Sequence, residues 1–249
     1  MDADVCIVGG GVSGLAAGIF TARADLETVV VDDEESILRR NAHLENYPGF
    51  PFGVDGRRLL ERTREQARIG GCSFRDGLVT DVEDGLDDDG FTVTVDDETT
   101  FSTDRVVAAS WSDASYLDGL GIDTETRGSK TFVQVDREGR TNVDGIYAAG
   151  RLADQYHQAI VCAGHGATVG RTIVHDSDVN FYHDWVAPED YFTGRGREVP
   201  PGCEEIDDAR RLERDERARD ALRTYTEPLD DEPTMHPSVA ADREGTEHT

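Results

Sequence analysis

The sequence predicts an α/β protein: a single Rossmann-like three-layer domain with an antiparallel β-meander, followed by a C-terminal extension. A strand, a glycine-rich turn, a helix and a second strand open the sequence, which is the order of a βαβ unit. Short runs that alternate apolar residues with threonine or charged residues then occupy residues 78–101. A further apolar strand and a glycine-rich helix at residues 145–174 complete the sheet.

The first elements build the parallel part of the sheet. Residues 4–9 and 27–32 are predicted to be buried strands, because apolar and β-branched residues dominate both runs. Residues 14–24 between them predict a helix of small and apolar residues. After a polar loop, residues 56–70 form an amphipathic helix that can cover the sheet.

The meander and the return to the parallel sheet come next. Three short antiparallel strands, joined by turns rich in Asp and Gly, are predicted at residues 78–83, 91–95 and 99–101. Residues 105–109 and 145–150 are predicted to be buried strands, and residues 158–174 a helix whose glycines and alanines allow close packing. This order predicts a sheet whose parallel strands come from two distant segments.

The domain is therefore expected at residues 1–175, formed from residues 1–110 and 115–175. Residues 176–249 form the extension, which is aromatic at first, then a charged helix, then an acidic terminus containing proline. A polar, acidic terminus buries too little apolar surface to offset its chain entropy, so we expect the extension to be partly disordered.

Acidic residues dominate the composition. The chain has 52 Asp and Glu against 25 Lys and Arg, a net charge of -27, and Lys130 is its one lysine. Such a charge argues against nucleic acid as a partner. An acidic, lysine-poor surface is typical of proteins kept soluble in concentrated salt, where the Debye length falls to about 3 Å near 1 M. We interpret the chain as halophilic; a mesophilic protein with a disordered acidic tail is the alternative.

Membrane, metal and disulfide functions are not indicated. No apolar run approaches the ~20 residues that span a bilayer, and no signal-like segment opens the sequence, so we expect a cytoplasmic protein without a membrane partner. The cysteines are widely separated, with no Cys-x-x-Cys and no cluster at zinc spacing. We therefore expect no metal site and no disulfide framework.

Three glycines carry the first chemical motif. Gly9, Gly11 and Gly14 form a Gly-x-Gly-x-x-Gly pattern directly after a predicted strand. Gly9 permits the tight turn, Gly11 lets the backbone approach a pyrophosphate, and Gly14 lets helix and strand pack closely. Val12 and Ser13 lie where the helix N-terminus would face the diphosphate.

An acidic residue completes the motif. Asp32 ends the next predicted strand, about 20 residues after the glycines, and its carboxylate can accept hydrogen bonds from a ribose. Asp33 could take that role if the strand ends one residue later. The combination predicts dinucleotide binding but does not decide which dinucleotide.

Two further segments resemble the thioredoxin reductase family. Residues 45–50, Glu-Asn-Tyr-Pro-Gly-Phe, resemble that family's loop after the second strand. Residues 141–150, followed by Tyr-His-Gln-Ala at 156–159, resemble the family segment that ends in Tyr-Arg-Gln-Ala. The resemblance extends over residues 4–110 and 115–175 and implies FAD, rather than NAD, as the cofactor.

The resemblance also implies the flavin contacts. Asn46 would lie beside the flavin, and Gln158 and Ala159 would present a helix N-terminus that stabilises negative charge on the reduced ring. Trp111 could cover the cofactor or fill the space of a missing domain. The remaining contacts that we expect along the cofactor are Val82, Ala109, Gly150, Arg151 and His157.

Several side chains depart from the family pattern. Arg151 stands where the family has an acidic residue, and we hypothesise that its guanidinium pairs with the diphosphate. Arg39 and Arg40 could face the phosphates, an electron-carrier protein or water. His157 replaces the family arginine and could carry a proton to or from a reduced flavin, although the sequence favours a structural histidine. Cys162, the other candidate catalytic residue, is a lone thiol of the kind that more often packs than reacts.

The largest departure is a missing domain. About 35 residues stand where the family inserts its NADPH-binding domain, and they contain neither a second glycine fingerprint nor a cysteine. The resemblance thus implies an FAD-dependent oxidoreductase that is reduced by a separate donor, such as an electron-carrier protein, and cannot reduce thioredoxin by the usual dithiol route. Family members dimerise through this domain, so a homodimer is expected. The alternatives are a non-catalytic flavin-binding or redox-sensing interaction protein, and a nicotinamide-dependent enzyme that uses the single fingerprint.

Overall fold

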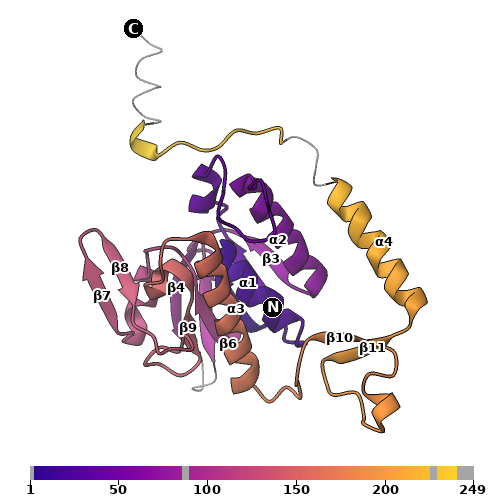
Figure 1. The fold of residues 1–249 in the computed structure, drawn as a ribbon. Coiled ribbons are helices and arrows are strands. Elements are labelled where there is room, and N and C mark those ends of the chain that lie inside the picture. The colour runs from indigo at the N-terminus through magenta and orange to yellow at the C-terminus, as the bar shows by residue number, and fades with distance from the viewer. Residues whose placement is uncertain (1–2, 86–89, 225–228, 240–249) are drawn as a thin grey trace.

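One seven-stranded sheet organises the domain. The computed structural model describes residues 3–85, 90–224 and 229–239. The strand order is β3-β2-β1-β6-β5-β4, with β9 beside β6 (Figure 1). The parallel part consists of β3 (Ser73–Asp76), β2 (Thr28–Asp32), β1 (Ala3–Val8), the second half of β6 (Thr99–Ala108) and β9 (Ile146–Ala148).

Strand β6 joins the parallel sheet to the meander. Its first half pairs antiparallel with β5 (Phe91–Val95), which in turn pairs with β4 (Val79–Asp84). Its second half pairs in parallel with β9, with Val106 opposite Ile146. The prediction of separate strands at residues 99–101 and 105–109 was therefore wrong, because one long strand crosses from the meander into the parallel sheet.

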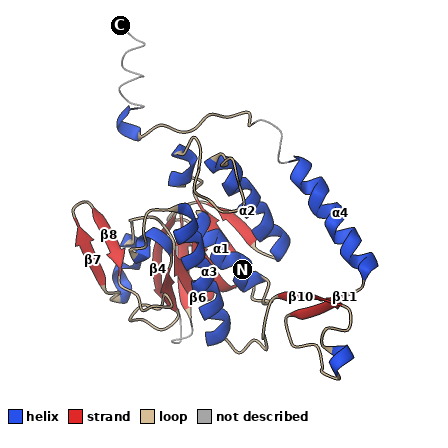
Figure 2. Cartoon of the chain, in the orientation of Figure 1, coloured by secondary structure: helices blue, strands red, loops and turns tan. Residues whose placement is uncertain are grey.

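Both faces of the parallel sheet are covered, as its apolar strands require. In β1, Val5 and Ile7 belong to the core beneath the helices, whereas Cys6 and Val8 belong to the core on the meander side. Val5, Cys6 and Ile7 are completely buried. Helices, parallel sheet and meander thus form three layers (Figure 2), and the predicted fold class is confirmed.

Helices α1 (Val12–Ala22), α2 (Gly56–Gly70) and α3 (Ala159–Asp176) cover one face of the sheet. Glycines set the close approach of α3 to α1. A Cβ added to Gly166 would lie 2.0 Å from the carbonyl oxygen of Ser13, and one added to Gly170 would lie 2.5 Å from that of Ala17. This contact brings the segment after residue 145 against the N-terminal βαβ unit.

The segment between β6 and β9 has structure of its own that the sequence did not indicate. It contains the short helix η3 (Ser115–Leu120) and a hairpin of β7 (Thr124–Arg127) and β8 (Lys130–Val133). The side chains of Leu117, Phe132 and Val133 are buried and anchor the segment to the domain.

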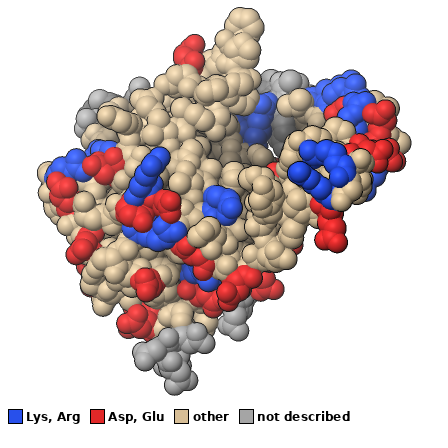
Figure 3. All heavy atoms as spheres, turned by 60° about the horizontal axis from the view of Figure 1, so that its bottom comes forward, with Lys and Arg blue, Asp and Glu red and all other residues tan. Residues whose placement is uncertain are grey.

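The C-terminal extension lies beside the domain. It contains a parallel pair of β10 (Trp185–Pro188) and β11 (Cys203–Ile206), the short helix η5 (Thr193–Arg195), and α4 (Asp208–Thr224). Basic and acidic side chains lie side by side where α4 forms the right-hand edge of Figure 3. The disorder that we predict for part of this extension falls in part on residues 240–249, which lie outside the described residues, whereas residues 229–239 are described. None of the described helices is long and apolar enough to cross a membrane.

Candidate cofactor site

A cavity of about 910 Å³ lies at the carboxyl ends of β1, β2 and β6. Ligands of open α/β sheets bind at this edge, and cofactor sites typically have volumes of about 300–1,000 Å³. Five stretches of chain contribute to the walls, within residues 8–13, 31–46, 77–97, 109–116 and 151–162. The cavity is therefore formed jointly by the two segments that the sequence analysis singled out.

We call the part formed by residues 9–13 the glycine-rich end. Gly9 has φ +107°, which side-chain-bearing residues rarely adopt. No side chain caps the start of α1 among the described residues, so its first N–H groups can bind an anion. Gly14 does not line the cavity. An added Cβ there would lie 2.0 Å from the carbonyl oxygen of Gly9, so Gly14 sets how closely the helix approaches the turn.

The carboxylate of Asp32 is held by two donors. Its side chain accepts hydrogen bonds from the Gly10 N–H at 3.0 Å and from Arg64 Nη1 at 2.9 Å. A carboxylate has about four acceptor positions, so a ribose hydroxyl can still donate to it. Asp33 also lines the cavity and accepts from the Glu35 N–H. Gly10 and Arg64 were missed in the sequence because neither occupies a defined position of the glycine motif.

We call the part formed by Trp111, Arg151, His157 and Cys162 the aromatic end. The rings of Trp111 and His157 meet edge to face, with centroids 4.5 Å apart. Lys130, from the β7–β8 hairpin, places its ammonium group 5.5 Å from the Trp111 centroid. Trp111 lines the cavity, which favours the cofactor-covering role among the two that the sequence left open.

Arg151 lines the cavity and packs on the aromatic ring of Phe132. Its guanidinium lies over the Phe132 ring at 4.7 Å, and its Nη1 donates to the Gln155 carbonyl at 2.9 Å. Its Nε is buried and has no hydrogen-bond partner among the described residues. Leaving such a donor without a partner costs roughly 1–3 kcal/mol. The volume of the cavity and the uncapped N–H groups at the start of α1 fit a large ligand with anionic oxygen atoms, such as an FAD.

A hydrogen bond connects the two distant segments. Asn46 Nδ2, in the loop between β2 and α2, donates to Gln158 Oε1 at 2.7 Å. Gln158 immediately precedes α3, whose N-terminus has no side-chain cap in the described structure. Ala159 begins that helix and lines the cavity with both residues. The amide pair and the helix N-terminus thus lie together in the wall of the cavity.

The two candidate catalytic residues are both uncharged near neutral pH. Partial desolvation, together with the charges of Arg151 and Lys130, lowers the pKa of His157 below its usual 6.5. Burial raises the pKa of the Cys162 thiol, which disfavours the reactive thiolate. His165, which does not line the cavity, accepts the Gly150 N–H through Nδ1 at 3.1 Å, and burial lowers its pKa as well.

Most of the predicted contacts lie together in this cavity, and four do not. The residues in its wall are Gly9, Gly11, Val12, Ser13, Asp32, Asp33, Arg40, Asn46, Ala109, Trp111, Arg151, His157, Gln158, Ala159 and Cys162. Those outside the wall are Gly14, Arg39, Val82 and Gly150. Val82 is completely buried in the core on the meander side, while Thr80 and Val79 of the same strand reach the cavity.

The other two outliers have structural partners. Arg39 Nη2 lies 3.6 Å from a carboxylate oxygen of Glu34. Gly150 is buried against Ser13, where an added Cβ would lie 2.5 Å from the hydroxyl oxygen. Further polar residues of the wall lie in loops, where no periodicity in the sequence identifies them: Ser36, His43, Ser110, Ser115 and Tyr116. No metal-binding group of His, Cys, Asp or Glu occurs in the part of the chain that the structure describes.

Comparison with known families agrees with this geometry. Residues 4–43 match the model of an FAD binding domain, and residues 75–166 match the model of pyridine nucleotide-disulphide oxidoreductases. A thioredoxin reductase of Rickettsia bellii is 28% identical over 197 residues, which are 76% of this chain and 60% of the relative. One of Mycolicibacterium smegmatis is 34% identical over 133 residues, 49% of this chain and 41% of the relative. The chain thus spans at most 60% of the length of these two relatives.

Solved structures show the same fold. A thioredoxin reductase from Gloeobacter violaceus superposes with a TM-score of 0.60 at 19% identity, covering 70% of this chain and 95% of its own. An oxidoreductase from Agrobacterium tumefaciens gives a TM-score of 0.63 at 15% identity, covering 71% of this chain and 98% of its own. In sequence this chain is similar to FAD-dependent pyridine nucleotide-disulphide oxidoreductases, thioredoxin reductases among them, and it shares the fold of the solved thioredoxin reductase.

Proposed function

We propose that this chain is an FAD-dependent oxidoreductase that is reduced by a separate donor and does not reduce thioredoxin through a dithiol of its own. The observation that carries the proposal is the segment between β6 and β9. This segment folds into η3 and the β7–β8 hairpin, and it contains neither a second glycine fingerprint nor a cysteine. The domain therefore presents a flavin site with no nicotinamide site built into that segment.

The cysteines support the second half of the proposal. All four are free. Thiol-disulfide exchange requires a thiolate and a second thiol within reach. Burial raises the pKa of Cys6 and of Cys72 to about 12, and it also raises the pKa of Cys162. A dithiol relay such as the family uses has no counterpart among these residues.

The residues of the cavity have distinct duties toward the cofactor. When bound, FAD supplies the hydride or electron transfer. The N-terminus of α1, at the glycine-rich end, would hold the diphosphate, and Asp32 would accept the ribose hydroxyls. At the aromatic end Trp111 would cover the ring system. His157, neutral at pH 7, can accept a proton there through an unprotonated ring nitrogen.

The visible spectrum and the reduction behaviour test the proposal. Protein purified in 2 M KCl should show the two absorption bands of a flavin. Mixed anaerobically with dithionite it should bleach within seconds, whereas equimolar NADPH alone should leave the bands unchanged over minutes. Stoichiometric bleaching by NADPH within seconds would contradict the separate donor. Colourless protein that cannot be reconstituted with FAD would contradict the proposed function altogether.

The substitution Cys162→Ser tests whether the Cys162 thiol takes part in the reaction or only packs in the cavity wall. We expect the variant to keep its flavin and to be oxidised and reduced at the wild-type rate, because the thiol is protonated and has no partner cysteine. Loss of turnover with retained flavin would give Cys162 a catalytic role.

The homodimer, the carrier protein, the cytoplasmic location and the halophilic origin remain predictions. Sedimentation at several salt concentrations checks the dimer.

A further inference from the structure

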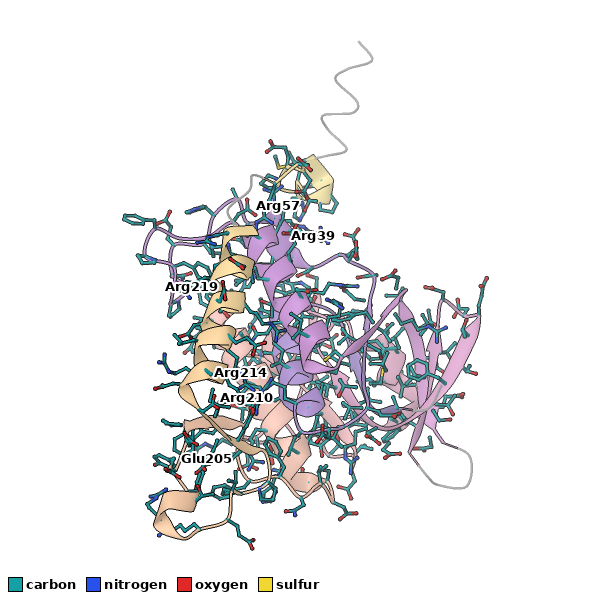
Figure 4. The ribbon with its side chains drawn as sticks, turned by 90° about the vertical axis from the view of Figure 1, so that its right-hand side faces the viewer. Arg39, Arg57, Glu205, Arg210, Arg214 and Arg219 are labelled. Carbon is teal, nitrogen blue, oxygen red and sulfur yellow. The ribbon has the colours of Figure 1, made fainter. Side chains whose placement is uncertain are left out.

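The described part of the C-terminal tail crosses the domain beside the cofactor cavity. Residues 229–239 run across the top of Figure 1, over the short helix η1 (Ile37–Arg40) and the start of α2. Figure 4 shows Arg57 and Arg39 beneath this segment, which we call the strap. Within the described residues, hydrogen bonds from the strap reach both of these helices. Arg57 Nη1 donates to the carbonyl and side chain of Asp231, and the Thr234 N–H donates to the Arg39 carbonyl at 3.1 Å.

The strap contacts two helices, η1 and α2, that pack against each other at a contact that we call the joint. Gly56, the first residue of α2, packs so closely on η1 that an added Cβ would lie 2.5 Å from the Leu38 carbonyl oxygen. Arg57 belongs to α2, while Arg39 belongs to η1. A segment bound to both helices therefore restrains their separation.

This joint is also part of the cofactor cavity. Ile37, Leu38 and Arg40 of η1 line it, as do most of the residues that follow up to Asn46. A shift of η1 would consequently move this part of the cavity wall. The hydrogen bond between Asn46 and Gln158 lies at the end of the same loop.

The side chain of Asp55 also helps to position Arg57 for this contact. The side chain of Asp55, the N-cap of α2, accepts from Arg57 Nε at 3.0 Å and from Nη2 at 2.6 Å. These bonds aim the remaining Nη1 at Asp231. The Arg57 side chain is only 7% exposed, and a buried guanidinium with an open donor is costly.

We propose that the strap is a structural part of the cofactor site, in which Asp231 and Arg57 are positioning residues that fix η1 and thereby the cavity wall. The inference rests on FAD as the occupant of the cavity. It assigns a role to a tail segment that the composition marks only as acidic and poorly ordered.

The test compares Asp231→Ala with Asp230→Ala in the full chain. Asp230 is an exposed neighbour for which the described residues offer no hydrogen bond or ion pair, so it controls for the loss of one charge. Thr234→Pro removes the second contact by deleting its N–H donor. Two quantities are measured: the Kd of FAD, from the quenching of flavin fluorescence, and amide hydrogen exchange of residues 37–46 in cofactor-free protein.

We expect Asp231→Ala and Thr234→Pro to accelerate exchange in residues 37–46 and to raise the Kd of FAD by about threefold to tenfold, and Asp230→Ala to change neither. Unchanged exchange in both variants would overturn the proposal. Accelerated exchange with an unchanged Kd would also overturn it, because the strap would then brace the fold without acting on the cofactor. Wild-type protein that binds no FAD would instead refute the proposed function, and the exchange data would still show whether the strap holds the joint.

Discussion

The two ends of the cofactor cavity are built in different ways. At the glycine-rich end the backbone forms the wall, and the important positions are those where a side chain is missing: Gly9, Gly10 and Gly11. At the aromatic end side chains form it, with Trp111 against His157. The shape of the glycine-rich end therefore depends on the backbone conformation. The shape of the aromatic end depends on which side chains this protein carries there.

This difference explains where the chain agrees with the thioredoxin reductase pattern and where it departs from it. A backbone site for a diphosphate tolerates little variation, since each glycine has a steric duty. A side-chain wall can exchange residues while the fold stays the same. Arg151 and His157 are such exchanges, and both lie at the aromatic end. Changes at the two ends should accordingly have different consequences.

The largest effect is expected at Gly11. A Cβ there would meet only the Ser36 hydroxyl, at 3.7 Å, so the folded protein has room for a side chain. A valine would nevertheless occupy the path of the diphosphate. We expect Gly11→Val to weaken FAD binding by about 100-fold or more, equivalent to ~2.7 kcal/mol, without lowering the melting temperature of the cofactor-free protein.

Gly14→Ala is the matched control for this prediction. Its Cβ would overlap the Gly9 carbonyl, so the free energy of unfolding should fall by about 1–3 kcal/mol. Both quantities follow from flavin fluorescence titration and thermal unfolding. Full flavin occupancy in Gly11→Val would show that the diphosphate does not bind at this loop.

The next effect concerns Arg151, at the aromatic end. Truncation to alanine removes a guanidinium from the cavity wall and should raise the Kd of FAD by about tenfold, the order expected for one charge-assisted hydrogen bond. Arg127 is the control. It also stacks on Phe132, at 4.3 Å, but it does not line the cavity, so Arg127→Ala should change the Kd by less than about twofold. Equal Kd values for both variants would mean that Arg151 only packs.

Salt should affect the whole cavity. Six carboxylates, those of Asp32, Asp33, Glu35, Glu45, Asp97 and Asp113, line it against the two guanidinium groups of Arg40 and Arg151. An anionic diphosphate is therefore repelled on balance, and screening weakens that repulsion. We expect the Kd of FAD to fall by about threefold to tenfold between 0.1 and 1 M KCl. A Kd that rises with salt would show that the cations dominate.

The smallest effect is a pH dependence at the aromatic end. Folding lowers the pKa of His157 below 6.5. As the pH falls, His157 is therefore protonated in the unfolded protein before it is protonated in the folded protein. This contribution to stability is complete above pH 6.5 and is lost as the pH drops through the lower folded-state pKa. His157→Gln should flatten the dependence of the unfolding free energy on pH between 5 and 6.5. His165→Gln is the comparison, since the pKa of His165 is also lowered. An unchanged slope in His157→Gln would show that its pKa is not shifted.

The spacing of the sequence predicted the positions of the glycine motif but not their partners, for a physical reason. Gly9, Gly14 and Asp32 are identified by spacing, because strand, turn and helix have fixed dimensions. The partner that Asp32 finds in Arg64 could not be read from spacing, since it depends on how α2 lies over the sheet.

The remaining misses have the same origin. In the β7–β8 hairpin, β7 and the first half of β8 are polar, so the sequence shows no clear alternation of apolar and polar residues. Phe132 is buried only through tertiary packing. The contact of Asp231 with Arg57 joins residues 174 positions apart. A composition that suggests disorder carries no information about a contact of that kind.

The central claim is that one FAD extends from the glycine-rich end to the aromatic end of this cavity. A crystal structure of the FAD-loaded chain tests it most directly. Our account predicts the diphosphate at the backbone of Gly11 and Val12, and the flavin ring beside Trp111 and His157. An FAD bound in the opposite direction, or outside this cavity, would contradict it.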